Sequence, residues 1–160
     1  MMIKHVGLIL GSILLFSACT GQPQKEESAF IVLKTASIKY ADMGFIKSSP
    51  SKVQVEMYAA GQPLVSIEIN GMNICMSTFE CMEKHDFNEK ILHASYPDTL
   101  LENIFKAKPI FNAENLEKTT DGFTQKIQKK GLYDITYTVV SGERKFRDTI
   151  NKILIKVREQ

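Results

Sequence analysis

Long hydrophobic runs are almost absent from this 160-residue sequence. The one clear run, residues 6–16, follows a short basic start and ends at Ser17, Ala18 and Cys19. At about eleven residues it is shorter than the roughly 20 that a membrane-spanning helix needs, but it suits the apolar core of a signal peptide. The pattern is typical of a lipoprotein signal peptide. We therefore predict that residues 1–18 are removed and that Cys19 carries the lipid.

One position departs from the usual lipobox, because Phe16 stands three residues before the cysteine where leucine is common. The alternative is an ordinary secretory signal cleaved after Ala18, which would leave Cys19 unmodified. Both interpretations export the protein. If Cys19 is lipidated, several acyl chains (a palmitate-type modification) anchor it permanently. Thr20 follows the cysteine instead of the Asp that retains some lipoproteins at the inner membrane, which favours the outer membrane.

Several features that enzymes and nucleic-acid-binding proteins need are also lacking. The sequence has no Gly-rich phosphate loop and no nucleophile elbow, and only His85 and His93 remain once the signal peptide is removed. Its basic residues are interspersed with acids, and the net charge is only +2. We therefore expect no catalytic residue, no cofactor and no nucleic-acid partner. The expected partners are the membrane, through the lipid, and a protein or a second copy, through exposed strand edges.

The chain after Cys19 divides into a tether and a domain. Residues 20–28 are polar and poor in side chains that could be buried, so residues 19–28 are predicted to be a lipidated cysteine with a flexible tether. Nine such residues reach about 15–18 Å on average. Residues 29–160 have the usual length of a single folded domain.

Alternation of apolar and polar residues predicts half-buried strands in most of this domain. Residues 53–57 and 65–69 alternate on either side of a Gly-Gln-Pro turn and predict a hairpin. Residues 133–139 and 153–157, with a turn at Ser141 and Gly142 between them, predict a second hairpin. Weaker strands are predicted over residues 30–35, 38–46 and 123–128. The total is about seven strands.

The middle of the chain has helical patterning instead. Asp86 and Glu89 form a capping-box pattern that predicts a helix over residues 86–94. Pro97 then precedes an apolar stripe over residues 100–105 that predicts a second short helix. Strands before and after this helical pair predict a β-sandwich with a two-helix insertion over about residues 83–108.

The two remaining cysteines, Cys75 and Cys81, form an even pair in an oxidising compartment, which favours a disulfide. The bridge requires the residues between them to form a loop, because six residues of a continuous strand span about 20 Å. Two free thiols are an alternative. Another alternative is a soft-metal site of the copper type, since thiolate, thioether and imidazole groups suit Cu(I). Its candidate ligands are Cys75, Met76, Cys81, Met82 and His85, with Met72 nearby.

Beyond the lipobox, several motifs in the exported part of the chain resemble those of a known protein family. They are Cys75 and Cys81 leading into Lys84-x-x-Phe87-Asn88, then Tyr96-Pro97-Asp98-x-Leu100-Leu101-Glu102-Asn103-Ile104, and Pro109-Ile110-Phe111. With these motifs the chain resembles the small outer-membrane lipoproteins of epsilonproteobacteria. The resemblance implies a variant immunoglobulin-like sandwich, self-association and a lipid visible to host immune receptors. It supplies no catalytic residue.

These observations together predict an envelope lipoprotein, in the outer rather than the inner membrane, that works as a non-catalytic binding or assembly module. Its helical insertion, residues 83–108, is the surface expected to distinguish it. The alternative function is an extracytoplasmic soft-metal binder centred on Cys75 and Cys81.

Overall fold

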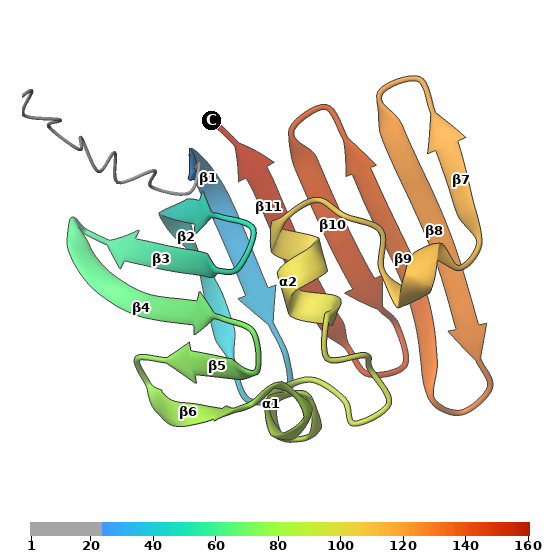
Figure 1. The fold of residues 1–160 in the computed structure, drawn as a ribbon, viewed down its shortest axis with the longest axis horizontal. Coiled ribbons are helices and arrows are strands. Elements are labelled where there is room, and N and C mark those ends of the chain that lie inside the picture. Colours follow the sequence, from blue (N-terminus) through green and yellow to red (C-terminus); the bar gives the residue numbers. More distant parts are fainter. Residues whose placement is uncertain (1–23) are drawn as a thin grey trace, which may run out of the picture.

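A computed structural model of the protein describes residues 24–160. The predicted signal peptide and Cys19 lie outside the described residues. The described chain forms a single antiparallel sheet of eleven strands with two α-helices and one short 3₁₀ segment (Figure 1). The strands are β1 (Lys25–Lys34), β2 (Lys39–Ser48), β3 (Val53–Ala59), β4 (Gln62–Ile69), β5 (Asn73–Met76), β6 (Phe79–Glu83), β7 (Leu116–Thr119), β8 (Gly122–Lys129), β9 (Tyr133–Val140), β10 (Glu143–Asp148) and β11 (Ile153–Glu159). The helical segments are α1 (Lys84–Ile91), α2 (Leu100–Phe105) and η1 (Phe111–Ala113).

The sheet consists of two meanders joined through the first and last strands. Its order is β6-β5-β4-β3-β2-β1-β11-β10-β9-β8-β7. Strand β1 pairs with β11 in an antiparallel register that places Ile31 opposite Val157. The two ends of the described chain therefore meet in the middle of the sheet, and the helices connect the two outer strands.

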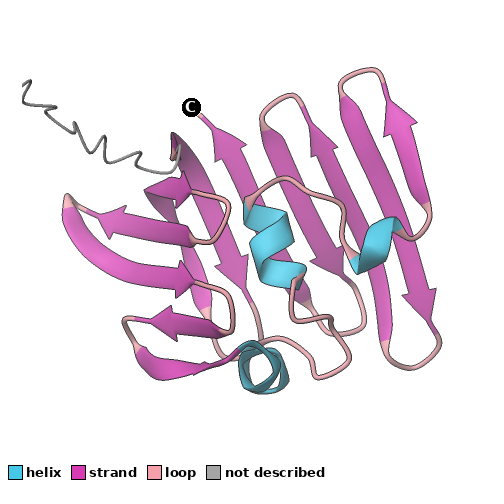
Figure 2. Cartoon of the chain, viewed as in Figure 1, coloured by secondary structure: helices cyan, strands magenta, loops and turns pink. Residues whose placement is uncertain are grey.

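The sheet bends, and the helices occupy the inside of the bend. In Figure 1 strands β3–β6 run across the direction of β7–β11, and α2 lies in front of β10 and β11. Figure 2 shows that helix is confined to this region of an otherwise β structure. Gly44 of β2 lies so close to β3 that a Cβ atom would stand 2.1 Å from the backbone oxygen of Glu56. Only glycine allows β2 and β3 to approach this closely.

Strand alternation explains which face of the sheet is covered. Ala29, Ile31 and Leu33 of β1 are buried, as are Val53 and Val55 of β3, while the residues between them are partly exposed. Successive residues of a strand point to opposite faces, so the buried set lies on one side. These side chains join those of both helices in a single hydrophobic core.

The mainly β class and the two-helix insertion are confirmed, but the sandwich of about seven strands is wrong. The structure has eleven strands in one bent sheet, without the two facing sheets of an immunoglobulin-like fold. The insertion fills the space that a second sheet would occupy. Strands β5, β6 and β7 were missed because they have only four or five residues each, too few for alternation to be visible.

The first predicted hairpin is confirmed as β3 and β4, and its turn uses left-handed backbone at Ala60 and Gly61 (φ 50° and 78°). The second predicted hairpin, of residues 133–139 with residues 153–157, is wrong because these two strands do not pair with each other. Strand β10 lies between β9 and β11 and pairs with both. Two of its buried residues, Arg144 and Asp148, are charged. The apolar alternation that predicts a strand is therefore absent there.

Three boundaries also differ from expectation. Helix α1 begins at Lys84 instead of Asp86 and ends at Ile91, and its N-cap, Glu83, makes no side-chain capping bond. Strand β1 begins at Lys25, so the last four residues of the predicted tether belong to the sheet. Helix α2 carries the predicted apolar stripe, which is buried. Neither helix of residues 24–160 is long and apolar enough to cross a membrane.

Candidate functional site

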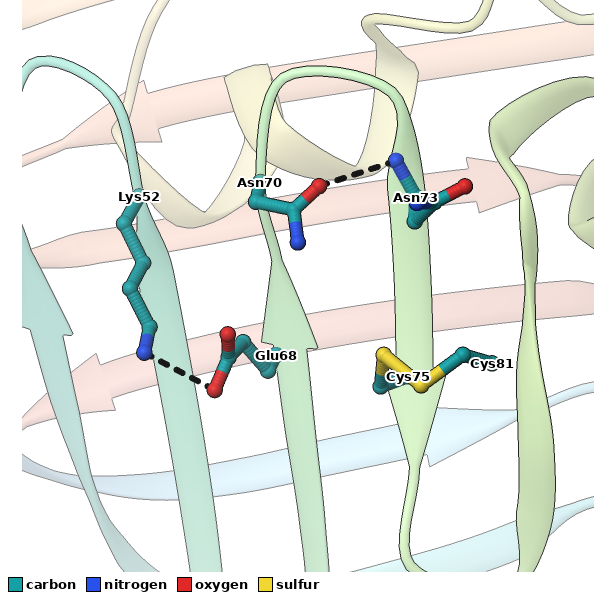
Figure 3. Close-up of a disulfide and its surroundings, with 6 residues drawn as sticks. All are labelled: Lys52, Glu68, Asn70, Asn73, Cys75 and Cys81. Atoms are coloured by element: carbon teal, nitrogen blue, oxygen red, sulfur yellow. Dashed lines mark hydrogen bonds and ion pairs between the residues drawn. A yellow bond between two sulfur atoms is a disulfide. The ribbon is translucent and has the colours of Figure 1, made fainter.

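The two cysteines of the domain form the predicted disulfide. Cys75 in β5 and Cys81 in β6 are joined, and their Cα atoms are 3.9 Å apart. A tight turn makes this geometry, because Met76 pairs with Phe79 and closes the hairpin. Figure 3 shows the bridge beside Glu68, which lies opposite Cys75 in the register of β4 and β5 and is paired with Lys52. The helices lie behind the sheet in this view.

The structure does not assemble the predicted soft-metal ligands. The disulfide uses both cysteine sulfur atoms, and Met76 is buried in the core on the opposite side of the strand from Cys75. Met82 packs partly against the core, whereas His85 is exposed and lies 3.9 Å from a carboxylate oxygen of Asp98. Within residues 24–160, no group of three or more His, Cys, Asp or Glu side chains is placed to hold a metal ion.

The helical insertion has its apolar side against the sheet. Its largest buried side chains contribute to the core and are inaccessible to a partner: Phe87, Ile91, Tyr96, Leu100, Leu101, Ile104 and Phe105. Of the helical insertion, which we expected to form the distinguishing surface, only the polar side is therefore accessible to a partner. Three buried polar contacts, described next, hold the insertion in place.

The first contact joins the loop between the helices to the sheet. The Tyr96 hydroxyl donates a hydrogen bond of 2.5 Å to the Asp148 carboxylate, which also accepts one of 2.8 Å from Asn151. Burial alone would raise the pKa of Asp148, but the hydrogen bonds from Tyr96 and Asn151 outweigh it and lower that pKa. Burial and the bond to Asp148 raise the pKa of Tyr96. Asp148 is thus a buried carboxylate with its bonds satisfied.

The second contact joins both helices to the turn between β2 and β3. Glu102 accepts hydrogen bonds from Lys84 at 2.8 Å and from Lys106 at 2.7 Å, and Lys106 also donates to the backbone oxygen of Pro50 at 3.1 Å. Burial would raise the pKa of Glu102, but the bonds from Lys106 and Lys84 outweigh it and lower that pKa. Each lysine is compensated by the same carboxylate, so the cluster is structural.

The third contact holds the end of α2. Arg144 is buried on β10, donates 2.7 Å to the backbone oxygen of Phe105 and forms an ion pair with Glu27 of β1. Burial lowers the pKa of Arg144, and the nearby charge of Glu159 partly offsets this effect. Tyr137, on the neighbouring strand, is fully buried, and its hydroxyl has no hydrogen-bond partner within residues 24–160.

The surface of the sheet opposite the helices, called the bare face from here on, is covered by no described segment. On the C-terminal half it is basic. Pairing places Arg147 of β10 beside Leu154 of β11, and Leu154 beside Lys34 of β1. The next row places Lys145 beside Lys156. Six cations of the bare face lie on β1, β8, β10 and β11: Lys34, Lys126, Lys145, Arg147, Lys156 and Arg158. Lys39 and Lys47 of β2 lie on the same face, opposite Lys34 and Glu26 of β1.

An apolar strip adjoins these cations on β1 and β2. Met43 and Phe45 point outward from β2 and are each 42% exposed. Phe30 of β1 lies between Met43 and Arg158 in the register, and the ring of Tyr58 contacts Phe45 edge-on at 6.0 Å. The bare face thus combines large exposed apolar side chains with a basic region.

Sequence reasoning missed this surface because charges scattered along the chain converge only when strands pair. Lys145 and Arg147 alternate with buried Arg144, Phe146 and Asp148, so the local sequence reads as mixed charge. The signal was present in β10 and β11 as cations at alternate positions, Lys145 and Arg147 on one strand and Lys156 and Arg158 on the other. It could be recognised only together with the strand order.

The comparisons with known proteins identify no relative for the chain. No protein-family model matches it, and no curated protein matches it either.

Proposed function

We propose that this protein is a lipid-anchored envelope lipoprotein, in the outer rather than the inner membrane, that acts as a non-catalytic binding or assembly module through its bare face. The observation that carries the proposal is the composition of that face. Met43 and Phe45 are large apolar side chains left accessible beside a group of cations, whereas most large apolar side chains on the other face of the sheet are buried in the core. Exposed apolar surface of this kind marks interaction sites.

The expected place of the lipid agrees with this proposal. Gln24, the first described residue, precedes β1 directly, and β1 carries Phe30 and Val32 on the bare face. Only a few residues would therefore separate a lipid on Cys19 from this face, which would keep the face close to the bilayer. In the described domain, the buried ionisable groups Asp148, Glu102 and Arg144 are engaged in structural contacts.

Two measurements test the proposal in the native host. The intact mass of the mature protein should show a diacylglycerol and an acyl chain on Cys19, and Cys19→Ser should release the protein from the membrane fraction. A photo-crosslinking amino acid at position 45 should then give adducts in the envelope, while one at Lys90, exposed on α1, should give none. An unmodified Cys19, or equal crosslinking from both positions, would contradict the proposal.

The buried hydroxyl of Tyr137 favours a second function, in which the protein binds an apolar ligand with a polar end. Its hydroxyl is buried without a described partner on the covered face, and leaving such a group unpaired costs about 1–3 kcal/mol. The neighbouring Arg144 binds the end of α2. If the helical insertion moved outward, an acyl chain could replace it and its polar end could bond Tyr137.

Binding of a fluorescent fatty acid tests this second function. Saturable binding that weakens in Tyr137→Phe would support it, and Tyr58→Phe, which removes an exposed hydroxyl of the bare face, is the matched control. If no saturable binding occurs with the wild-type protein, the interior is simply a filled core.

A further inference from the structure

We propose that the bare face binds a membrane surface rich in anionic lipid headgroups. This inference rests on the proposed function, because it names the partner of the same surface. It needs no contribution from the lipid on Cys19, so the two can be tested separately.

The charge of the bare face is unbalanced where β10 and β11 meet. Their six outward residues comprise four cations, one acid and Leu154. The acid, Glu143, is already paired with Lys156 at 2.9 Å. Lys145, Arg147 and Arg158 are exposed and make no ion pair with any described residue. The surplus positive charge is therefore available to an external anion.

The spacing of these cations suits an array of phosphates better than a single ion. Neighbouring strands lie about 4.8 Å apart, and successive outward residues of one strand about 6.8 Å apart. Lys145, Lys156 and Arg147 occupy adjacent points of this grid, and Lys126 lies two strands further along the row of Arg147. Each cation near a bilayer containing acidic lipids strengthens binding about fivefold.

The apolar strip supplies a second contribution. Met43 and Phe45 project from the strand next to β1, and each remains 42% exposed beside its neighbours on the face. Apolar side chains that flank basic ones enter the boundary between headgroups and acyl chains. A soluble acidic protein would satisfy the cations alone, whereas a bilayer surface satisfies both parts of the bare face.

A second copy of the chain fits this surface less well. In a two-fold pairing, the cations would face the acids on the same face of the other copy, among them Glu56 of β3 and Glu68 of β4. Those carboxylates are already engaged, because Glu56 accepts hydrogen bonds from Gln54 and Tyr58, and Glu68 is paired with Lys52 at 2.8 Å. These two acids are therefore less available to the cations of a second copy.

The length of the preceding chain allows the bare face to reach the bilayer. Gln24 follows Cys19 by five positions, a stretch of chain that spans at most about 18 Å. Strand β1 starts one residue later and pairs with β11, which carries Lys156 and Arg158. A lipid on Cys19 would thus lie beside the proposed contact surface.

Cosedimentation with vesicles tests the inference on an unlipidated protein beginning at Thr20, which retains every described residue and the whole core. We expect binding to vesicles of phosphatidylglycerol and phosphatidylcholine, weaker binding at high salt, and little binding to pure phosphatidylcholine. The double variant Lys145→Gln with Arg147→Gln should bind about 25-fold more weakly. Its control, Lys90→Gln with Lys118→Gln, removes the same charge away from the bare face and should bind like the wild type.

A variant of the strip, Met43→Ser with Phe45→Ser, should bind more weakly while the salt dependence stays unchanged. An intact disulfide and an unchanged thermal midpoint establish that each variant is folded. Absence of vesicle binding, equal binding to both vesicle types, or equal loss in the control variant would overturn the inference. So would a dimer of the wild-type protein that dissociates in the Lys145 and Arg147 variant. Crosslinks from position 45 without vesicle binding would overturn this inference alone and leave the proposed function standing.

Discussion

The two faces of this sheet are built from the same strands but have opposite chemistry. On the covered face, polar groups such as Asp148 and Arg144 are each engaged by hydrogen bonds or ion pairs with the helical insertion or the sheet. On the bare face, Lys145 and Arg147 are without ion pairs to the described chain, and Phe45 is left exposed. Stability is thus concentrated on one face, and the other is free to bind a partner.

The largest expected contrast comes from one phenylalanine on each face. Phe105→Ala should destabilise the protein by about 3–5 kcal/mol, because it opens a cavity between α2 and the sheet. Phe45→Ala should cost only about 1 kcal/mol, because its side chain is 42% exposed and the substitution removes little more than the edge contact with Tyr58. Urea unfolding measures both values. If the two variants lost similar amounts of unfolding free energy, the two faces would contribute equally to stability, which would contradict this comparison.

The disulfide should give the next largest effect. Replacing Cys75 and Cys81 together with alanine should cost about 2–2.5 kcal/mol, as expected for the unfolded-state entropy of a short closed loop. The effect should appear in thermal and urea unfolding and should be reproduced by reducing the wild-type protein. Because the bridge lies at the edge hairpin, vesicle binding below the unfolding transition should be unchanged. A loss of binding without unfolding would place the hairpin in the binding surface.

Breaking the contact between Tyr96 and Asp148 should cost somewhat less. Tyr96→Phe removes a hydrogen bond to a buried carboxylate and should destabilise the protein by about 2 kcal/mol near neutral pH. The folded-state pKa of Asp148 is lowered, so its stabilising contribution is present above the unfolded-state pKa of about 3.9 and is lost as the pH falls through the folded value.

Acid unfolding checks the same contact. The wild-type protein should lose stability below about pH 4, and Tyr96→Phe should lose less over the same range, since the pKa of its Asp148 is less depressed. An unchanged acid dependence in the variant would show that the depressed pKa of Asp148 does not depend on Tyr96.

The smallest effect on stability is expected from the cations. Lys145→Gln and Arg147→Gln should each alter the free energy of unfolding by no more than about 0.5 kcal/mol, although together they should greatly weaken vesicle binding. Differential scanning calorimetry with and without anionic vesicles would separate the two properties. A large loss of stability without vesicles would mean that these side chains have a structural role.

The sequence predicted the covered face better than the bare one. Val53, Val55 and Met57 identified β3 because apolar alternation records burial on one side. Strand β10 escaped because Arg144 and Asp148 take buried positions and are compensated by Phe105 and Tyr96, which lie far away in the sequence. The even pair of cysteines predicted the disulfide, and the structure shows the loop that the bridge requires, since Met76 and Phe79 close a tight hairpin.

The bare face could not be predicted from any single segment. Its cations come from five strands, and Lys34 stands beside Leu154 only because the first strand pairs with the last. That pairing is fixed by the packing of the helical insertion and both meanders into one core, which local patterns do not encode. The expected interaction surface therefore moved from residues 83–108 to the opposite side of the sheet.

Lysine footprinting of the native envelope tests the central claim most directly. The chain carries exposed lysines on both sides, so acetylation followed by mass spectrometry compares them within one molecule. If the bare face contacts the membrane, Lys126 and Lys145 are protected in intact envelopes and become reactive when the protein is released, while Lys90 and Lys118 react equally in both states. Equal reactivity of all four lysines, or protection of Lys90 and Lys118 instead, would contradict the account.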